Sequence, residues 1–211
     1  MDIVTAALAS ALACSPLSDE KLAGLWESIS VSRGGVGHNL EFRIDGSYTT
    51  ATTVLVDLRY EIRDGEFFMS HNSGEEIDFS NGARIEETET DFTLTKDDVV
   101  EVKTKQTPTE EKTIVGTYVY RHYSGRMAYE KYTDDGKVIF RLPIESKSGC
   151  LKLDENMIFL QADEGQREFT YSMRGENLHL EESDGTRYAY KRVPEGAWYD
   201  SKNIDYEEPG E

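Results

Sequence analysis

Basic residues are scarce in this sequence of 211 residues. It contains 23 Lys and Arg against 41 Asp and Glu, which gives a formal net charge of −18. A surface of that sign repels nucleic-acid phosphates and anionic lipid headgroups. The composition therefore argues against nucleic acid as a partner and indicates a solvated acidic surface.

Cysteines are scarce as well. Cys14 and Cys150 are too few for a disulfide framework, and their spacing is unlike that of a zinc site. One interpretation joins the two in a single disulfide. The other is processing of Cys14, which leaves Cys150 as a lone thiol packed as a small hydrophobe. The sequence leaves both interpretations open.

Long apolar runs are also rare. Residues 3–13 form an apolar run that is too short to span a bilayer and that ends at Cys14. The run resembles the central part of a bacterial lipoprotein signal, with Ala11-Leu12-Ala13-Cys14 at the cleavage position, although Asp2 stands where a basic residue is usual. We therefore expect residues 1–17 to be a signal and tether, with a lipid anchor on Cys14 as the attachment to a membrane. The expected location is the cell envelope, on the periplasmic face of the outer membrane; a cytoplasmic protein with an amphipathic N-terminal helix is the alternative.

Helical periodicity is missing between residues 22 and 193. Apolar and polar residues alternate instead, as in residues 40–44 and 58–62, which predicts strands with one face in a core and places Ile44 and Ile62 inward. Asp-Gly pairs supply the positive φ of tight hairpin turns; they stand at 45–46, 64–65, 135–136 and 184–185. The sequence predicts an all-β meander of antiparallel strands.

The meander occurs twice. The turn at 45–46 corresponds to the turn at 135–136, and in each copy a second turn follows at the same distance, at Asp64 and at Asp154. A unit this long is a duplicated domain rather than a solenoid repeat. The polar residues 106–112, interrupted by a proline, are the expected linker. The expected domains are therefore 18–107 (the first repeat) and 108–194 (the second repeat), followed by an acidic tail at 195–211.

Four features of the first repeat occur in a fixed order. They are Leu22-x-Gly24-x-Trp26, a long loop, the Phe42-x-x-Asp45-Gly46 hairpin and a closing strand that ends in a basic residue. Together they resemble the small lipocalin-like (calycin) β-barrel of bacterial envelope proteins, here in two tandem copies over residues 22–193. The resemblance implies two antiparallel up-and-down barrels, each closed by tight turns at one end and open at a mouth among longer loops.

The resemblance also implies a role for a basic side chain of the last strand. In that family an arginine packs over the tryptophan of the first strand, so Arg192 is expected over Tyr118 or Tyr120 of its own repeat. Lys103 and Lys105 of the first repeat alternate with apolar residues and are expected to face solvent.

The inward positions that strand alternation predicts contain apolar residues and tyrosines, without a catalytic acid, base or nucleophile. We therefore expect neither an enzyme nor a cofactor. The expected function is non-enzymatic binding of a small apolar or amphipathic molecule at a barrel mouth. A structural or protein-interaction module with filled barrels is the main alternative. The expected ligand-binding side chains are Phe42, Tyr60 and Met69 at one mouth and Phe140, Tyr171 and Arg192 at the other.

A further alternative uses two histidines. His38 and His71 are expected at the mouth of the first repeat with inward alternation, where imidazoles can bind a metal or a haem iron. No second histidine or cysteine stands two or four residues after either of them.

Overall fold

The computed structural model describes residues 14–77, 81–122 and 124–194, and these residues are almost entirely β-structure. One short 3-10 helix, η1 (Glu20–Leu22), precedes fourteen strands. The prediction of an all-β antiparallel protein is confirmed. Within the described ranges no helix has the length and apolar character needed to cross a membrane. The strands are β1 (Gly24–Ser28), β2 (Val36–Phe42), β3 (Ser47–Arg63), β4 (Glu66–His71), β5 (Ala83–Glu87), β6 (Asp91–Lys96), β7 (Val99–Thr104), β8 (Gly116–Arg121), β9 (Met127–Tyr132), β10 (Lys137–Asp154), β11 (Met157–Ala162), β12 (Gly165–Arg174), β13 (Asn177–Glu181) and β14 (Arg187–Arg192).

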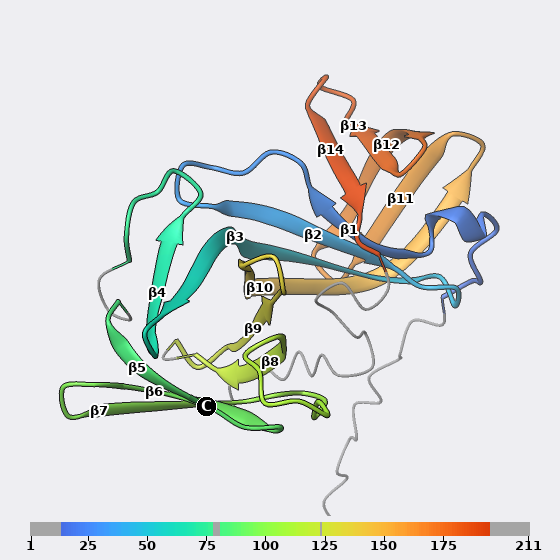
Figure 1. Ribbon diagram of the computed structural model, residues 1–211. Coiled ribbons are helices and arrows are strands. Elements are labelled where there is room, and N and C mark those ends of the chain that lie inside the picture. Colours follow the sequence, from blue (N-terminus) through green and yellow to red (C-terminus); the bar gives the residue numbers. More distant parts are fainter. Residues whose placement is uncertain (1–13, 78–80, 123, 195–211) are drawn as a thin grey trace, which may run out of the picture. The chain divides into compact units, whose positions relative to one another are not determined.

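All these strands belong to one sheet, in which the first strand of the chain pairs with the last. The order is β7-β6-β5-β4-β3-β2-β1-β14-β13-β12-β11-β10-β9-β8, and β3 and β10 also pair with each other (Figure 1). In the β1–β14 pair, Trp26 lies opposite Arg192. At the two ends of the order, a bridge joins Lys105, the residue after β7, to Tyr118 of β8.

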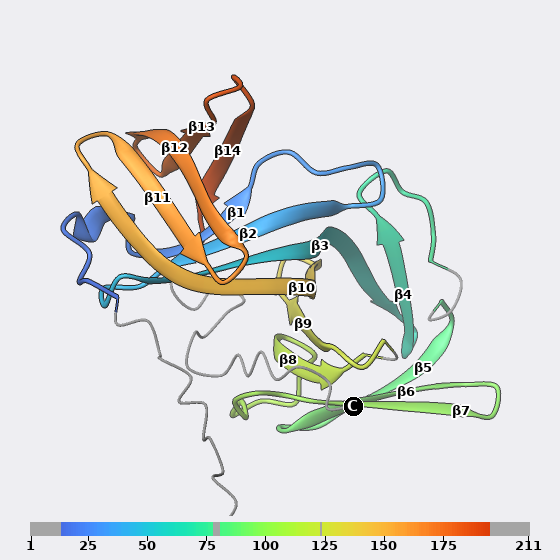
Figure 2. The same cartoon turned by 180° about the vertical axis from the view of Figure 1, so that it is seen from behind.

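The chain divides into two compact units, and each unit is assembled from both repeats. Of the described residues, unit 1 contains 14–29, 39–50 and 147–193, and unit 2 contains 30–38, 51–146 apart from the gaps, and 194. The chain passes between the units within β2, β3 and β10. Of these, β3 and β10 have 17 and 18 residues and are the long strands of Figures 1 and 2. The compact units therefore differ from the expected domains 18–107 and 108–194, and the expected linker lies inside unit 2.

The two repeats form equivalent turns, each with a partner from the other repeat. Gly46 and Gly136 adopt positive φ angles of +80° and +79°. The Gly46 carbonyl accepts a hydrogen bond from the Leu151 amide at 2.7 Å, and the Gly136 carbonyl accepts one from the Tyr60 amide at 2.8 Å. Leu151 and Tyr60 therefore occupy equivalent positions in the two units.

The first strands of the two repeats are equivalent too. The indole N–H of Trp26 donates to the Leu22 carbonyl at 2.9 Å, and the hydroxyl of Tyr118 donates to the Ile114 carbonyl at 2.7 Å. All four residues are buried. A buried polar tip needs such a partner, because an unpaired one costs about 1–3 kcal/mol.

Each unit has its own apolar core. Burying a large apolar side chain contributes about 1.5–3 kcal/mol, so these cores are the main stabilising contribution in each unit. The core of unit 1 contains Leu17, Leu22, Trp26, Leu40, Phe42, Tyr48, Leu151, Ile158, Leu160, Phe169, Leu178, Leu180 and Tyr190. The core of unit 2 contains Leu58, Phe67, Met69, Ala83, Phe92, Leu94, Ile114, Tyr118, Tyr132 and Val138.

Two inward assignments made from alternation are wrong. Ile44 is 63% exposed and Ile62 is 38% exposed, whereas Leu40 and Phe42 are buried as expected. Ile44 lies beyond the end of β2 at Phe42, where the strand alternation no longer applies. Ile62 lies one residue before the end of β3, in the exposed last part of that strand.

The predicted orientation of the lysines on and after β7 is also wrong. Lys103 and Lys105 are only 5% and 4% exposed, while Val102 is 59% exposed. In the β6–β7 ladder Lys103 lies opposite the fully buried Phe92, and opposed residues of an antiparallel pair share one face. The valines suggested the opposite register, and a shift of one residue turns every side chain of a strand to the other face.

Candidate functional site

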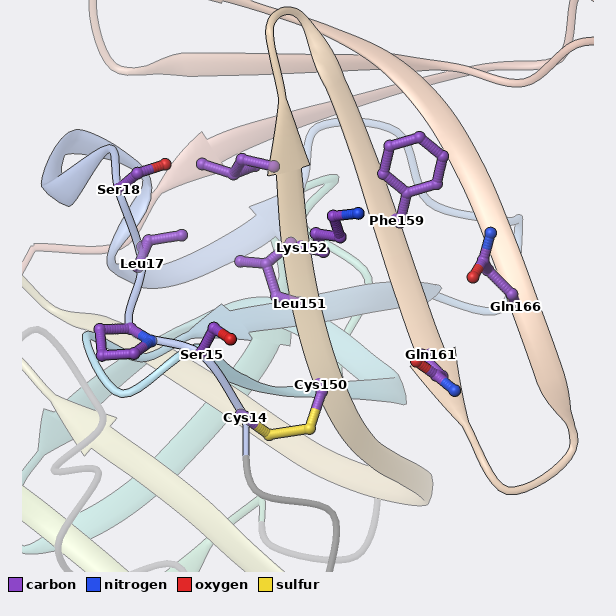
Figure 3. A pocket seen from close by; sticks show the side chains of 12 residues that line it. Cys14, Ser15, Leu17, Ser18, Cys150, Leu151, Lys152, Phe159, Gln161 and Gln166 are labelled. Atoms are coloured by element: carbon purple, nitrogen blue, oxygen red, sulfur yellow. A yellow bond between two sulfur atoms is a disulfide. The ribbon is translucent and has the colours of Figure 1, made fainter.

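A pocket of about 400 Å³ lies in unit 1, between the N-terminal strap (residues 14–18) and strands β10, β11 and β12 (Figure 3). A volume of that size falls within the ~300–1,000 Å³ that is typical of small-molecule sites. Its described lining residues are Cys14, Ser15, Pro16, Leu17, Ser18, Cys150, Leu151, Lys152, Leu153, Phe159, Gln161 and Gln166.

Three attachments hold the strap in place. A disulfide joins Cys14 to Cys150 of β10. The Leu17 amide donates to the Ile44 carbonyl at 2.9 Å. The Leu17 side chain is buried in the core of unit 1 and points toward Leu151 in Figure 3. The strap is therefore a fixed wall of the pocket.

The disulfide matters for the two interpretations of the cysteines. The structure contains the Cys14–Cys150 bridge. A bridged sulfur has no valence left for the thioether of a lipid anchor, so the bridge and lipidation of Cys14 are mutually exclusive states of that atom. Lipidation stays a prediction. The rest of the expected signal, residues 1–13, lies outside the described residues.

Gly46→Ala is expected to displace the strap. A Cβ at Gly46 would stand 1.8 Å from the Ser15 carbonyl oxygen, whereas a Cβ at the equivalent Gly136 would stand 3.1 Å from the Tyr60 carbonyl oxygen. Both glycines have nearly the same positive φ, so Gly136→Ala is a matched control for backbone strain. We expect Gly46→Ala to lower the free energy of unfolding by about 1–3 kcal/mol more than Gly136→Ala, as measured by urea denaturation. Equal losses in the two variants would show that the strap does not press on the turn.

The lining of the pocket combines an apolar wall with one cationic side chain, Lys152. Leu17, Leu151, Leu153 and Phe159 supply apolar surface. Lys152 is exposed, and among the described residues its ammonium group forms no ion pair. No carboxylate stands among the described lining residues, although the whole chain has 41 acidic residues. The pocket thus has the chemistry to hold an amphipathic molecule with a neutral or anionic head.

The structure regroups the six expected ligand-binding residues. Phe42, Tyr171 and Arg192 fall in unit 1, and Tyr60, Met69 and Phe140 fall in unit 2. None of the six lines the 400 Å³ pocket.

The surroundings of these residues differ. Phe42 and Met69 are buried in the two cores, and Phe140 is half-buried. The Tyr60 hydroxyl donates to the Thr133 carbonyl at 2.8 Å. Tyr171 lines a smaller hollow of about 170 Å³ formed by residues of β12, β13 and β14.

Arg192 lies over a different ring from the one expected. Its guanidinium carbon is 4.1 Å from the ring centroid of Trp26, and its Nη1 donates to the Ala23 carbonyl at 2.6 Å. The expectation of Tyr118 or Tyr120 is wrong because β14 closes on β1 of the first repeat. Glycine suits position 24 because its φ of +126° is one that residues with a Cβ rarely adopt, and a Cβ there would stand 2.7 Å from Nη1 of the arginine.

Sequence reasoning missed a buried polar cluster in unit 2. It consists of Lys103, Glu130, Tyr120 and Tyr132, and is called the unit 2 polar cluster below. The Lys103 ammonium is 2.7 Å from Glu130 Oε2, which also accepts the Tyr132 hydroxyl at 2.9 Å; the Tyr120 hydroxyl donates to Oε1 at 2.5 Å. The side chains of Lys103 and Glu130 are 6% and 7% exposed. The correct register, with Lys103 opposite Phe92, would have placed Lys103 inside unit 2 and so indicated a buried charge that needs a partner.

The hydroxyls of Tyr120 and Tyr132 stay protonated at neutral pH. Burial and the neighbouring Glu130 carboxylate raise the pKa values of Tyr120 and Tyr132 well above the ordinary value near 10. The hydroxyls are therefore hydrogen-bond donors to the carboxylate across the whole neutral range, and they stabilise its buried charge.

Alkaline pH is expected to destabilise unit 1 through Tyr190. Burial raises the pKa of this phenol to about 12 from an ordinary 10.0. Above about pH 10 the unfolded chain releases the Tyr190 proton while the folded chain keeps it. The contribution of Tyr190 to the free energy of unfolding is therefore fully present below that pH, and about 3 kcal/mol is lost as the pH rises through 12. Urea denaturation as a function of pH measures this loss. Tyr190→Phe should remove that share of the dependence, and an unchanged slope in the variant would contradict the assignment.

The two histidines considered for metal or haem binding, His38 and His71, are both exposed and both belong to unit 2. Within the part of the chain that the structure describes, no group of three or more His, Cys, Asp or Glu side chains is placed to hold a metal ion.

Comparison of the chain with protein-family models, curated proteins and solved structures finds no match. The resemblance to lipocalin-like barrels stays a prediction from the sequence.

Proposed function

We propose that this protein binds a small amphipathic molecule, without catalysing a reaction, in the pocket between the N-terminal strap and strands β10 to β12. The observation that carries the proposal is the 400 Å³ pocket with its apolar wall and with Lys152, which forms no ion pair with the residues that the structure describes. Each methylene group that leaves water for the apolar wall contributes about 0.8 kcal/mol before the cost of ordering the ligand. The Lys152 ammonium favours an anionic head over a cationic one.

The finer assignment of the fold belongs to the same proposal. Each unit is a small lipocalin-like barrel in which a Gly-x-aromatic first strand lies under a basic side chain. Arg192 over Trp26 supports this in unit 1. In unit 2 the support comes from Lys105. Its backbone forms a β-bridge with Tyr118, and carbons of its side chain would stand 3.5 Å from a Cβ at Gly116.

An oxidising compartment such as the cell envelope is also part of the proposal. It is supported by the Cys14–Cys150 disulfide, because cytosolic thiols are normally kept reduced. Mass spectrometry of protein from envelope fractions tests it: the bridge, or a lipid on Cys14, is expected there, and a chain with two free thiols would contradict it.

Calorimetric titration with three probes of equal chain length tests the ligand class. Dodecanoate is expected to bind with one site per chain and a negative heat-capacity change, more tightly than dodecanol and much more tightly than dodecylamine. Lys152→Glu should weaken dodecanoate binding about three- to tenfold and leave dodecanol nearly unchanged, as an exposed charge contact predicts. Leu153→Trp should fill the pocket and abolish binding of all three probes.

The matched control is Lys191→Glu, which makes the same charge change at an exposed lysine of unit 1 outside the pocket. It should leave dodecanoate binding unchanged. Tighter binding of dodecylamine would refute the anionic head, and failure of all three probes to bind would refute the pocket as a site for such amphiphiles.

A further inference from the structure

Equivalent positions of the two units carry different chemistry. In unit 1, Trp26 lies between Leu40 of β2 and Arg192 of β14. In unit 2 the equivalent Tyr118 lies between Glu130 of β9 and Lys105. Leu40 and Glu130 therefore occupy the same place in the two units, one with an apolar side chain and the other with a carboxylate.

The same correspondence relates Lys103 to Tyr190. Each stands two residues before the basic residue opposite the Gly-x-aromatic strand. Lys103 lies opposite Phe92 of β6, and Tyr190 lies opposite Leu178 of β13. Unit 1 is thus filled with apolar and aromatic side chains where unit 2 holds a buried ion pair.

A buried ion pair needs an explanation other than stability. Apolar side chains of similar volume are often as stabilising as the pair or more so, and unit 1 has such side chains at the equivalent positions. Loss of one partner alone is strongly unfavourable, because the other charge remains buried. An ion pair at such a place therefore distinguishes correct from incorrect partners.

The incorrect partners here are the strands of the same repeat. If the first repeat closed on itself, β7 would take the place of β14 and bring Lys103 to Leu40. Lys103 would then lose Glu130 and keep the Glu101 carboxylate of its own strand, whose side chain is 42% exposed. If the second repeat closed on itself, β14 would bring Tyr190 to Glu130, with no cation. Both self-closed arrangements would bury a charge without its buried counter-charge.

We propose that the Lys103–Glu130 pair directs the two repeats to close crosswise, so that the end of β7 in the first repeat meets β8 in the second, where a bridge joins Lys105 to Tyr118. The pair acts against the self-closed arrangement rather than for overall stability. This inference is independent of the proposed ligand site, which lies in unit 1.

The natural cysteines report the arrangement. Cys150 precedes Leu151, whose amide binds the Gly46 carbonyl next to the strap. Because Tyr60 is the equivalent of Leu151, Arg59 would stand beside Cys14 if the first repeat closed on itself. A Cys14–Cys150 bridge within one chain therefore marks crosswise closure. In a Cys150→Ser/Arg59→Cys background, a bridge from Cys14 to the new cysteine marks self-closure.

The experiment is oxidative refolding of both cysteine backgrounds from the reduced, unfolded chain, with the bridges identified by peptide mass mapping. With the natural ion pair we expect the Cys14–Cys150 bridge in the first background and almost no bridge in the second. Lys103→Met/Glu130→Leu should raise the self-closure bridge about tenfold or more, because neither arrangement then buries a charge. The reversed pair Lys103→Glu/Glu130→Lys should restore crosswise closure, and the exposed control pair Lys147→Met/Glu164→Leu should change nothing.

Two results would overturn the proposal. One is a self-closure bridge in the chain with the natural ion pair. The other is fully crosswise closure of Lys103→Met/Glu130→Leu. If that variant does not fold, Lys103→Glu and its reversed pair decide: self-closure in the single variant and recovery in the double variant support the proposal, and equal behaviour of the two refutes it.

Discussion

Glu130→Leu is expected to lower the free energy of unfolding by about 3–5 kcal/mol. The substitution leaves the Lys103 ammonium almost completely buried without its counter-charge at 2.7 Å. It also removes the acceptor of the Tyr120 and Tyr132 hydroxyls. Glu101 is 3.5 Å from Lys103, but its side chain is 42% exposed and compensates only in part. Urea denaturation followed by the circular dichroism of the tyrosines measures the loss.

The double variant Lys103→Met/Glu130→Leu separates charge from packing. Both charges are then absent, so we expect a smaller loss than in Glu130→Leu. The loss that remains comes from the Tyr120 and Tyr132 hydroxyls, which no longer have the Glu130 acceptor, at about 1–3 kcal/mol for a buried hydroxyl. A double variant as unstable as Glu130→Leu would mean that shape rather than the buried charge accounts for the loss.

Loss of the Cys14–Cys150 bridge is the second large effect, with an expected cost of about 2–4 kcal/mol. The bridge joins residues that are 136 apart in sequence, so its removal frees a long loop of the unfolded chain. It also releases the end of the strap, so dodecanoate binding should weaken together with stability. Urea denaturation and calorimetry of Cys14→Ser/Cys150→Ser measure the two losses.

Reduction of the natural protein should reproduce both losses, whereas dithiothreitol should have no effect on the serine variant. A natural protein whose stability is indifferent to dithiothreitol would contradict the role of the bridge.

The local parts of the fold could be predicted from the sequence because they depend on local chemistry. The positive φ of Gly46 and Gly136 was predictable from the Asp-Gly pairs. Alternation placed Leu40, Phe42 and Leu58 correctly in cores. It failed at Ile44, where the strand had already ended.

The pairing of the repeats could not be predicted in the same way. Both repeats carry the same strand and turn signals, so crosswise and self-closed arrangements satisfy these signals equally well. Lys103 and Glu130 distinguish the two arrangements, but they are far apart in sequence. In addition, the predicted register of the strand was wrong by one residue, so Lys103 was expected to face solvent. The expected positions of the six ligand-binding residues, Arg192 among them, assumed that each repeat closes on itself. The structure groups these residues differently because each unit is assembled from both repeats.

The pocket was missed for a related reason. One wall consists of residues 14–18, and the prediction placed residues 14–17 in a signal and tether because of the apolar run before them. Of the lining residues, Leu151 lies in the core of unit 1 and Leu153 packs against it, so neither residue marks a pocket in the sequence. A strap bound to β10 by a disulfide could be anticipated only from the alternative interpretation of the two cysteines.

The measurement that tests the proposed function most directly is a titration of the isotope-labelled protein with dodecanoate, followed by amide and methyl NMR shifts. Saturable shifts are expected at the strap and at Leu151, Lys152 and Leu153, with none at unit 2 core residues such as Phe92 and Leu94. The absence of saturable shifts, or shifts confined to unit 2, would contradict the proposal that the pocket of unit 1 is the binding site.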